Sequence, residues 1–415
     1  MASPKDRSRD EHSTTHPVQY SRKRLTAMRI IDVTTTSATR MHGRDEQWFT
    51  HTFRSVKADL CLVTITTDEG VIGIGEACAY GNPVQIDDWV TWLAPTLIGA
   101  ELDDPRIVPR PTGTSFARPI ESAYDYAVAA IDCALWDARA RAKGLPVSRL
   151  INANSDDTVQ MYASGGVRYD WRTNNQNALV DDVLGYVAAG YSSIKFRLGT
   201  SWAWDGVTPE RFLELFDLVR KEVGPEVGLA VDANSRLSRE EAQAVAYGLD
   251  ERGALFFEEP IAKNDIDGYV ALTRSVELRI TGGETFTTVE QFRPWIERGA
   301  FNIAQPDAGV CGITELLAIG AIAERSGIDI VPHSWHNGVM AMANAHAVAA
   351  LPNGLMVEES KAQGPLVWDA IEGGTRVHDG VIDLSNDVGL GVSVIENLET
   401  VYPYVEGHYG VEVYR

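Results

Sequence analysis

Three acidic residues recur at equal intervals in the second half of the chain. Asp232 stands in VDAN, Glu258 in FFEEP and Glu284 in GGET, and each follows the one before it by 26 residues. One strand and one helix of an α/β barrel occupy about this length, so the three side chains are expected to meet at the barrel mouth. Converging carboxylates repel unless a cation neutralises them, and three hard oxygen ligands suit Mg²⁺. The sequence predicts a magnesium site; the alternative is that each acid is a salt-bridge partner.

Two further pairs favour chemistry at the same mouth. Within Glu258-Glu259 the side chains alternate along a strand, so Glu258 is expected to be the ligand and Glu259 to pair with a nearby strand. Lys195 and Arg197 are two residues apart and project to one side of their strand. Burial beside a metal would lower the pKa of the lysine and make it a base, whereas the guanidinium stays protonated and acts as a clamp. The alternative is that Lys195 and Arg197 lie on a surface strand that carries two cations by chance.

A histidine and an aspartate end two later strand-like runs. Asp307 stands in QPD and His333 in VPH, and an aspartate on an adjacent strand can hold the imidazole in the form that abstracts a proton. Further polar or aromatic residues near the strand ends are expected to bind substrate: Asn234, Glu358, Trp335 and His336. For His336, packing within the loop is an equal alternative.

The elements that must position these residues read as a barrel. Eight short apolar runs, QMYAS, SSIKFRL, VGLAVDAN, ALFFEEP, LRITGGET, FNIAQPD, DIVPHS and LMVEES, follow one another over roughly 200 residues. Amphipathic stretches such as PERFLELFDLVRKEV lie between most of them. This order favours a (β/α)₈-type barrel over an open doubly wound sheet, and no G-x-G-x-x-G follows a strand.

The first part of the chain has a different pattern. Residues 28–77 read as strands and residues 86–150 as helices, which predicts a small α+β domain. We expect a disordered leader or tag over residues 1–27, the α+β domain over 28–155 and the catalytic barrel over 156–385. The leader lacks the apolar centre of a secretory signal.

Composition excludes several classes of partner. The formal net charge is −21 and eight of the 37 basic residues are lysines, so neither nucleic acid nor an anionic membrane is an expected partner. An acidic, arginine-rich surface fits adaptation to high salt or an ordinary acidic enzyme. No apolar run is long enough to span a membrane, and Cys61, Cys78, Cys133 and Cys311 form no C-x-x-C pair. A soluble protein of a reducing cytoplasm is expected.

Together, IKFRLG, VDAN, FEEP, GGE, QPD, VPH and VEES resemble the mandelate racemase subgroup of the enolase superfamily from residue 28 onward. The resemblance implies a (β/α)₇β barrel with an N-terminal α+β capping domain completed by residues 386–415, and often a homo-oligomer. It implies Mg²⁺ on Asp232, Glu258 and Glu284 and an acid/base dyad of His333 with Asp307. Cap loops 39–51 and 79–82, with His42 and Tyr80, would close over a small-molecule acid sugar and contact it.

One departure from that subgroup narrows the reaction. Racemases carry K-x-K, whose second lysine is a base facing the histidine, whereas this chain has Lys195-Phe196-Arg197. Arginine is a poor base, so one-base chemistry by His333 is favoured. The sequence therefore predicts dehydration of an aldonate or aldarate to a 2-keto-3-deoxy acid. Cycloisomerisation of a sugar-acid lactone or anhydro-sugar acid is the second hypothesis and epimerisation the third; a non-catalytic barrel is a remote alternative.

Overall fold

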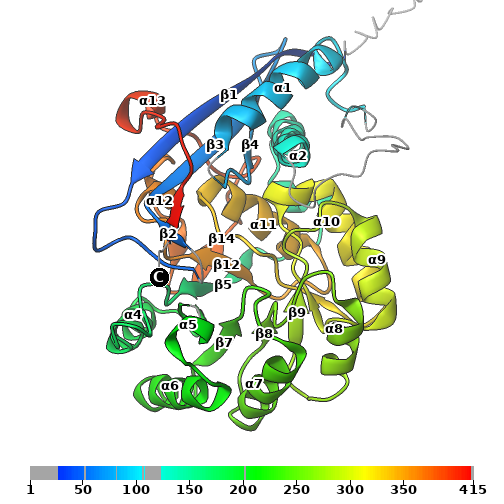
Figure 1. Ribbon diagram of the computed structural model, residues 1–415. Helices are drawn as coiled ribbons and strands as arrows, with labels where there is room; N and C mark the ends of the chain where they lie inside the picture. The colour runs from blue at the N-terminus through cyan, green and yellow to red at the C-terminus, as the bar shows by residue number, and fades with distance from the viewer. Residues whose placement is uncertain are drawn as a thin grey trace, which may run out of the picture.

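The computed structural model describes residues 27–50, 53–80, 82–104, 107, 123–200 and 202–412. In this part of the chain, a barrel lies below a smaller α+β cap (Figure 1). All of the expected leader except Ala27 lies outside the described residues. No helix that the structure describes combines the length and the hydropathy of a membrane span.

The cap is a three-stranded antiparallel sheet covered by helices. Its strands are β1 (Ile30–Met41), β3 (Lys57–Thr67) and β4 (Ile72–Ala77), in the order β1-β3-β4. Its helices are α1 (Pro83–Leu97), α2 (Ala123–Lys143) and α3 (Val147–Ile151). A Cβ at Gly73 or Gly75 of β4 would collide with backbone carbonyls of α2, so these glycines let the helix lie directly on the strand.

Each of the eight predicted runs forms a strand of the barrel. The strands are β5 (Thr158–Gly165), β6 (Ser193–Arg197), β7 (Gly228–Asp232), β8 (Phe257–Glu258), β9 (Ile280–Gly282), β10 (Ile303–Ala304), β11 (Asp329–Ile330) and β12 (Val357–Ser360). Neighbours pair in parallel from β5 to β11, and β12 pairs with β5. A parallel bridge between Ile330 and Gly354 closes the ring. The predicted barrel with an N-terminal cap is confirmed.

Helices follow most barrel strands and surround them (Figure 1). They are α4 (Asn177–Ala188), α5 (Trp202–Asp205), α6 (Pro209–Val223), α7 (Arg239–Glu251), α8 (Ile266–Thr273), α9 (Val289–Arg298), α10 (Ala308–Glu324) and α11 (Gly338–Ala350). The starts of α6 and α7 show ordinary capping chemistry. Thr208 precedes Pro209, the first residue of α6, and accepts a hydrogen bond from the backbone N–H of Arg211; Ser238 with Glu241 forms a capping box at α7.

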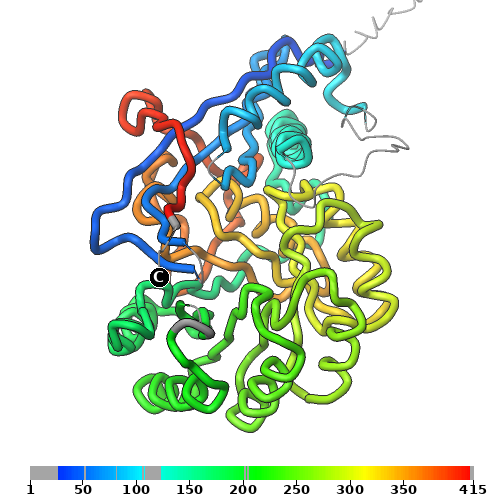
Figure 2. Tube along the Cα trace, in the orientation of Figure 1, coloured from blue at the N-terminus to red at the C-terminus, as the bar shows by residue number. Residues whose placement is uncertain are grey.

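The C-terminal residues return to the cap. After α12 (Leu366–Asp369), a hairpin of β13 (Val377–His378) and β14 (Val381–Asp383) adds to β5 in antiparallel fashion, which the sequence did not reveal. Helix α13 (Leu398–Val401) then lies beside β1. The last strand, β15 (Gly410–Glu412), pairs with β2 (Phe53–Ser55), so the C-terminal segment lies beside the part of the cap that follows β1 (Figure 2).

A buried carboxylate fastens the cap to the barrel. Glu76 of β4 accepts hydrogen bonds from the backbone N–H groups of Asn337, at 3.0 Å, and Met340, at 2.9 Å, at the start of α11. The side-chain amide of Asn337 donates to the same carboxylate and also to the carbonyl of Asp59. Burial raises the pKa of Glu76 to about 7, although these hydrogen bonds oppose the shift. The cap therefore supplies the N-terminal cap of a barrel helix.

Candidate active site

The predicted functional residues gather at one end of the barrel. Lys195 and Arg197 lie in β6, Asp232 ends β7, Glu258 ends β8, and Glu358 lies in β12. Glu284, Asp307 and His333 stand two or three residues beyond β9, β10 and β11. Parallel strands of a barrel present their carboxyl ends at one face, which is why residues so far apart in sequence meet here.

Lys195 lies between two carboxylates. Its Nζ is 2.6 Å from Oε1 of Glu258 and 2.9 Å from Oε1 of Glu358, and all three side chains are buried. Burial alone would lower the pKa of Lys195, but the two carboxylates raise it well above its usual value. This direction is opposite to the lowered pKa that the sequence led us to expect. Lys195 is therefore a fixed cation in this arrangement rather than a base.

Two of the three carboxylates expected to bind metal are held by other side chains. Asp232 accepts from the backbone and side-chain nitrogens of Asn234, both at 2.7 Å, and lies 3.3 Å from Nε of Arg197. Glu258 accepts from Lys195 and Gln305. Across the described ranges, no three His, Cys, Asp or Glu side chains are gathered tightly enough to enclose a metal ion.

The chemistry of these carboxylates nevertheless suits a hard divalent cation. Burial raises the pKa of Glu258 to about 8, and the charges of Asp232, Glu358 and Glu284 act in the same direction against the opposing effect of Lys195. Buried acids that repel one another in this way need positive charge to be ionised together. Asp232, Glu258 and Glu284 offer the oxygen ligands that Mg²⁺ prefers.

His333 and Asp307 form the expected pair. Nδ1 of His333 donates to Oδ2 of Asp307 at 2.7 Å, which leaves Nε2 to face Glu284 at 3.7 Å and Glu358 at 4.0 Å. Burial alone would lower the pKa of His333, but Glu284, Glu358 and Asp307 raise it to about 10. In this arrangement the imidazole is therefore protonated near pH 7, with Nε2 pointing toward the acids of the mouth. A cation bound to Glu284 would offset the largest of the charges that raise the pKa of His333 and so favour the neutral, basic form.

Asn344 holds this pair in place, and the sequence reading missed it. Its side-chain amide donates to Oδ1 of Asp307 at 3.1 Å and to the carbonyl of His333 at 3.2 Å. Its Oδ1 accepts from the N–H of Ala308 at 2.9 Å. The available signal was an amide in the run GVMAMANAHAVAA of α11, where Asn344 and His346 are the two polar side chains.

Replacing Asn344 by alanine is expected to lower both stability and turnover. The loss leaves buried partners unsatisfied, at a cost of about 1–3 kcal/mol in the free energy of unfolding, and frees Asp307 to rotate. Chemical denaturation and kcat of the folded variant measure the two effects. Asn353→Ala is the matched control, because Asn353 is a buried amide that bonds Gly320 and Ile328. Equal losses of kcat in both variants would contradict a positioning role for Asn344.

Arg197 lies against two indoles that meet edge to face. Its Cζ lies 4.1 Å from the ring centre of Trp335 and 5.5 Å from that of Trp48. Planar guanidinium groups stack well on aromatic faces, which an ammonium group does less well. Trp48 belongs to the cap, so Arg197 joins the cap loop to the barrel mouth.

A cavity of about 310 Å³ opens over these residues. It is lined by barrel residues, by residues of the first cap loops and by two residues of the C-terminal segment. The barrel contributes Arg197, Asn234, Glu284, Thr285, His333 and Trp335; the cap contributes Trp48, Thr50, Phe53 and Tyr80; and the C-terminal segment contributes His408 and Tyr409. Trp48 and Thr50 lie in the cap loop 39–51 that was predicted to close over the substrate, although neither was singled out. Phe53 and Tyr409 lie outside the predicted loops, in segments that carried no motif.

Three residues predicted to contact substrate, His42, His336 and Glu358, do not line this larger cavity, whereas Glu259 points away from the mouth as the sequence predicted. His42 does not line the cavity; it is buried in its loop, with Nδ1 3.5 Å from Arg40, and burial lowers its pKa to about 4. His336 lies behind the mouth, with Nε2 3.2 Å from Sγ of Cys78 and its ring beside that of Tyr80. Glu259 turns away at a positive φ of 39° and accepts from the hydroxyl of Ser235 at 2.8 Å, in the loop after β7.

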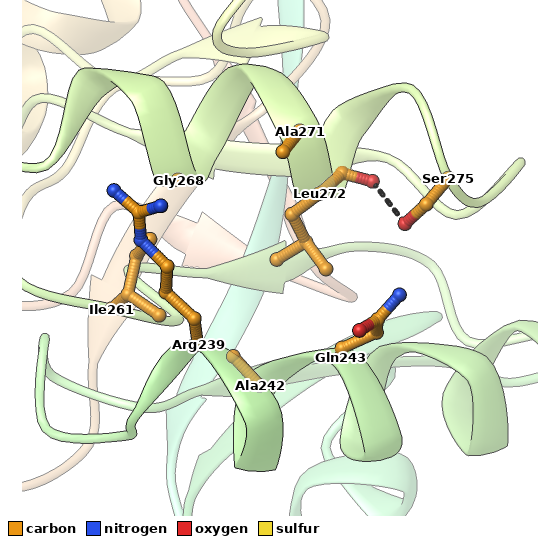
Figure 3. Close-up of a pocket in the computed structure, with 8 residues that line it drawn as sticks. All are labelled: Arg239, Ala242, Gln243, Ile261, Gly268, Ala271, Leu272 and Ser275. Carbon is orange, nitrogen blue, oxygen red and sulfur yellow. Dashed lines mark hydrogen bonds between the residues drawn. The ribbon is translucent and has the colours of Figure 1, made fainter.

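Another cavity, of about 160 Å³, lies between α7 and α8 on the outside of the barrel (Figure 3). Its lining residues are Arg239, Ala242, Gln243, Ile261, Gly268, Ala271, Leu272 and Ser275. The guanidinium of Arg239 is already paired with Asp265. None of these lining residues is an acid, a histidine or a lysine, so we place the active site at the barrel mouth.

Comparison with known proteins agrees with this fold and site. The family described as mandelate racemase / muconate lactonizing enzyme, N-terminal domain, matches residues 30–152. The family described as enolase C-terminal domain-like matches residues 178–398. The chain therefore belongs to the mandelate racemase and muconate lactonizing enzyme group of the enolase superfamily.

Individual relatives are acid-sugar enzymes. The chain is 27% identical to an arabinonate dehydratase of Saccharolobus solfataricus, over 83% of this chain and 90% of that protein. It is also 27% identical to a D-galactarolactone cycloisomerase of Agrobacterium fabrum, over 80% of this chain and 88% of that protein. The crystal structure of the 3,6-anhydro-D-galactonate cycloisomerase from Zobellia galactanivorans is 26% identical, with a TM-score of 0.78 over 91% of this chain and 100% of that one.

Proposed function

We propose that this enzyme dehydrates an acid sugar to a 2-keto-3-deoxy acid, with His333 as the base. The observation that carries the proposal is the His333–Asp307 pair, whose free Nε2 faces the acids of a cavity large enough for a small sugar acid. The names of the dehydratase relatives support the same substrate class.

His333, Asp307 and Lys195 have different roles in the proposed dehydration. His333 takes the proton from the carbon next to the substrate carboxylate, and Asp307 stabilises the imidazolium that results. Lys195, already cationic between Glu258 and Glu358, stabilises the negative charge that develops on the carboxylate oxygens. His333 then returns its proton to the departing β-hydroxyl. The α C–H and β C–O bonds are broken, a C=C bond forms, water leaves, and the enol tautomerises to the ketone.

Asp232, Glu258 and Glu284 would hold Mg²⁺. When bound, the ion supplies Lewis-acid stabilisation of the substrate carboxylate. The positive charge of the ion would also offset the repulsion between these acids, which adds to the effect of burial in raising the pKa of Glu258.

Arg197 is the reason for preferring one-base chemistry. Epimerisation needs a proton donor or acceptor on each face of the α-carbon, and the group two residues beyond Lys195 is a guanidinium stacked on Trp335. An arginine that stays protonated cannot serve as the second base. Cycloisomerisation is the second candidate, since two similar proteins are cycloisomerases and the same enolate can open a ring.

A substrate screen tests the proposal. Purified protein with Mg²⁺ is incubated with four- to six-carbon acid sugars, and 2-keto-3-deoxy products are detected as semicarbazones. We expect at least one product whose formation stops with chelator. If the folded protein leaves every acid sugar unchanged but converts lactones or anhydro-sugar acids, cycloisomerisation replaces dehydration as its function.

A further inference from the structure

A small second cavity lies next to the catalytic one. It measures about 20 Å³ and shares four aromatic lining residues with the larger cavity: Trp48, Tyr80, Trp335 and Tyr409. Space of about one water-sized sphere is enough for a hydroxyl group. A substrate chain that passes between these rings, away from His333, would bring its far end into the small cavity.

A buried ion pair also lines the small cavity, and neither of its residues lines the larger one. Nζ of Lys57 is 3.0 Å from Oδ2 of Asp59, and both side chains are almost fully buried. Lys57 also donates to the carbonyl of Val405 at 2.6 Å, and Asp59 accepts from the hydroxyl of Thr39 at 2.7 Å. The positive charge of Lys57 is therefore already neutralised by the buried carboxylate of Asp59.

Among the described residues that line the small cavity, Lys57 is the only lysine or arginine. His336 lines the small cavity, but burial lowers its pKa to about 4, so its imidazole is neutral near pH 7. Arg197 lines only the larger cavity and lies beside Asp232. A second substrate carboxylate would meet Asp59 without a free counter-charge, and like charges at such range repel strongly.

We infer that the small cavity is the distal end of the substrate site and that it selects monocarboxylic acid sugars with a neutral terminal hydroxyl over dicarboxylic ones. The inference rests on the proposed function and narrows its substrate class to aldonates and their ring forms. Size and charge agree: the space fits one hydroxyl group, and the Lys57–Asp59 pair offers both a donor and an acceptor to it. Tyr409 makes the C-terminal segment part of this selection.

Matched six-carbon pairs test the inference: D-gluconate with D-glucarate, and D-galactonate with galactarate. kcat/KM is measured with Mg²⁺, and binding is measured by calorimetry with the inactive His333→Asn variant, which reports selection without turnover. We expect the monoacid of at least one pair to be favoured by about tenfold or more, which corresponds to about 1.4 kcal/mol. If the diacid binds as tightly as its monoacid in both pairs, the inference is overturned and dehydration is left intact. If no acid is turned over but the monoacid still binds more tightly, the result counts against dehydration alone. If none of the acids binds, the result counts against both dehydration and the selection of monoacids.

Two substitutions give the mechanism of selection. Asp59→Asn leaves Lys57 unpaired, so the diacid/monoacid ratio should rise by about tenfold or more. Lys57→Gln should move the ratio the other way. Asp103→Asn is the control, because it removes the same charge from an exposed cap ion pair with Lys143. Folding of each variant is checked by circular dichroism, and the wild-type ratios test the inference without any variant. An unchanged ratio in folded Asp59→Asn would overturn it.

Discussion

Replacing His333 by asparagine is expected to lower kcat by about 10²–10⁴-fold, because a positioned general base contributes that much to a proton transfer. Asparagine is similar in length and keeps a donor toward Asp307, but it has no nitrogen that can accept the α-proton. Two measurements check this: formation of the 2-keto-3-deoxy product, and exchange of the α-hydrogen in D₂O. Both should fall together if His333 removes the proton.

The control for His333→Asn is His378→Asn. His378 lies exposed in β13, away from the cavity, so its replacement should leave kcat unchanged. If α-hydrogen exchange survives in folded His333→Asn while product formation stops, another group removes the proton and His333 acts only as the acid. Full activity in folded His333→Asn would contradict the one-base mechanism.

Removing divalent cations is expected to stop turnover and to destabilise the protein most at high pH. The raised pKa of Glu258 means that its contribution to stability is fully present below the usual pKa of a glutamate and is lost as pH rises through about 8. Glu76, with its pKa raised to about 7, acts in the same direction. Mg²⁺ at 100 times its dissociation constant should raise the free energy of unfolding by about 2.7 kcal/mol. Denaturant melts at about pH 6 and pH 9, with Mg²⁺ and with chelator, measure the difference.

The matched variants for this prediction are Glu284→Gln and Glu290→Gln. Glu284 lies in the mouth, whereas Glu290 is an exposed acid of α9 whose partner is Arg293. Only Glu284→Gln should lose the stabilisation by Mg²⁺. Equal stabilisation of both variants would place the cation somewhere other than on these three carboxylates.

The barrel and its reacting groups were predictable because their signals are local. Each run combines a few apolar residues with a polar tip, and barrel topology then brings the tips together without further information. Asp232, Glu258 and Glu284 are brought to one mouth by the strands that carry them, and His333 meets Asp307 because β10 and β11 are neighbours. Because each strand–helix unit advances the chain by one strand around the barrel, side chains at the strand ends converge on one mouth.

The residues that shape the pocket were not predictable in the same way. Trp48 contacts Arg197, and Tyr409 packs edge-on against Phe53 at 5.3 Å, through contacts between segments that no repeat relates. His42 was selected for its position in a cap loop, but that loop turns it toward Arg40 instead of the cavity. The direction of the Lys195 pKa also depends on two carboxylates from other strands, whose distances a sequence does not contain.

The contacts of Glu76 restrict how substrate can enter and product can leave. Because β4 caps α11 only a few residues after His333, a swing of the whole cap would leave buried N–H groups of Asn337 and Met340 unpaired. Opening through the short β2–β15 pairing breaks far fewer bonds and leaves the His333–Asp307 pair untouched. We therefore expect exchange of substrate and product to follow the faster motions of loops rather than slow hinge motion of a domain. The segment that opens for substrate can therefore move without displacing the catalytic base.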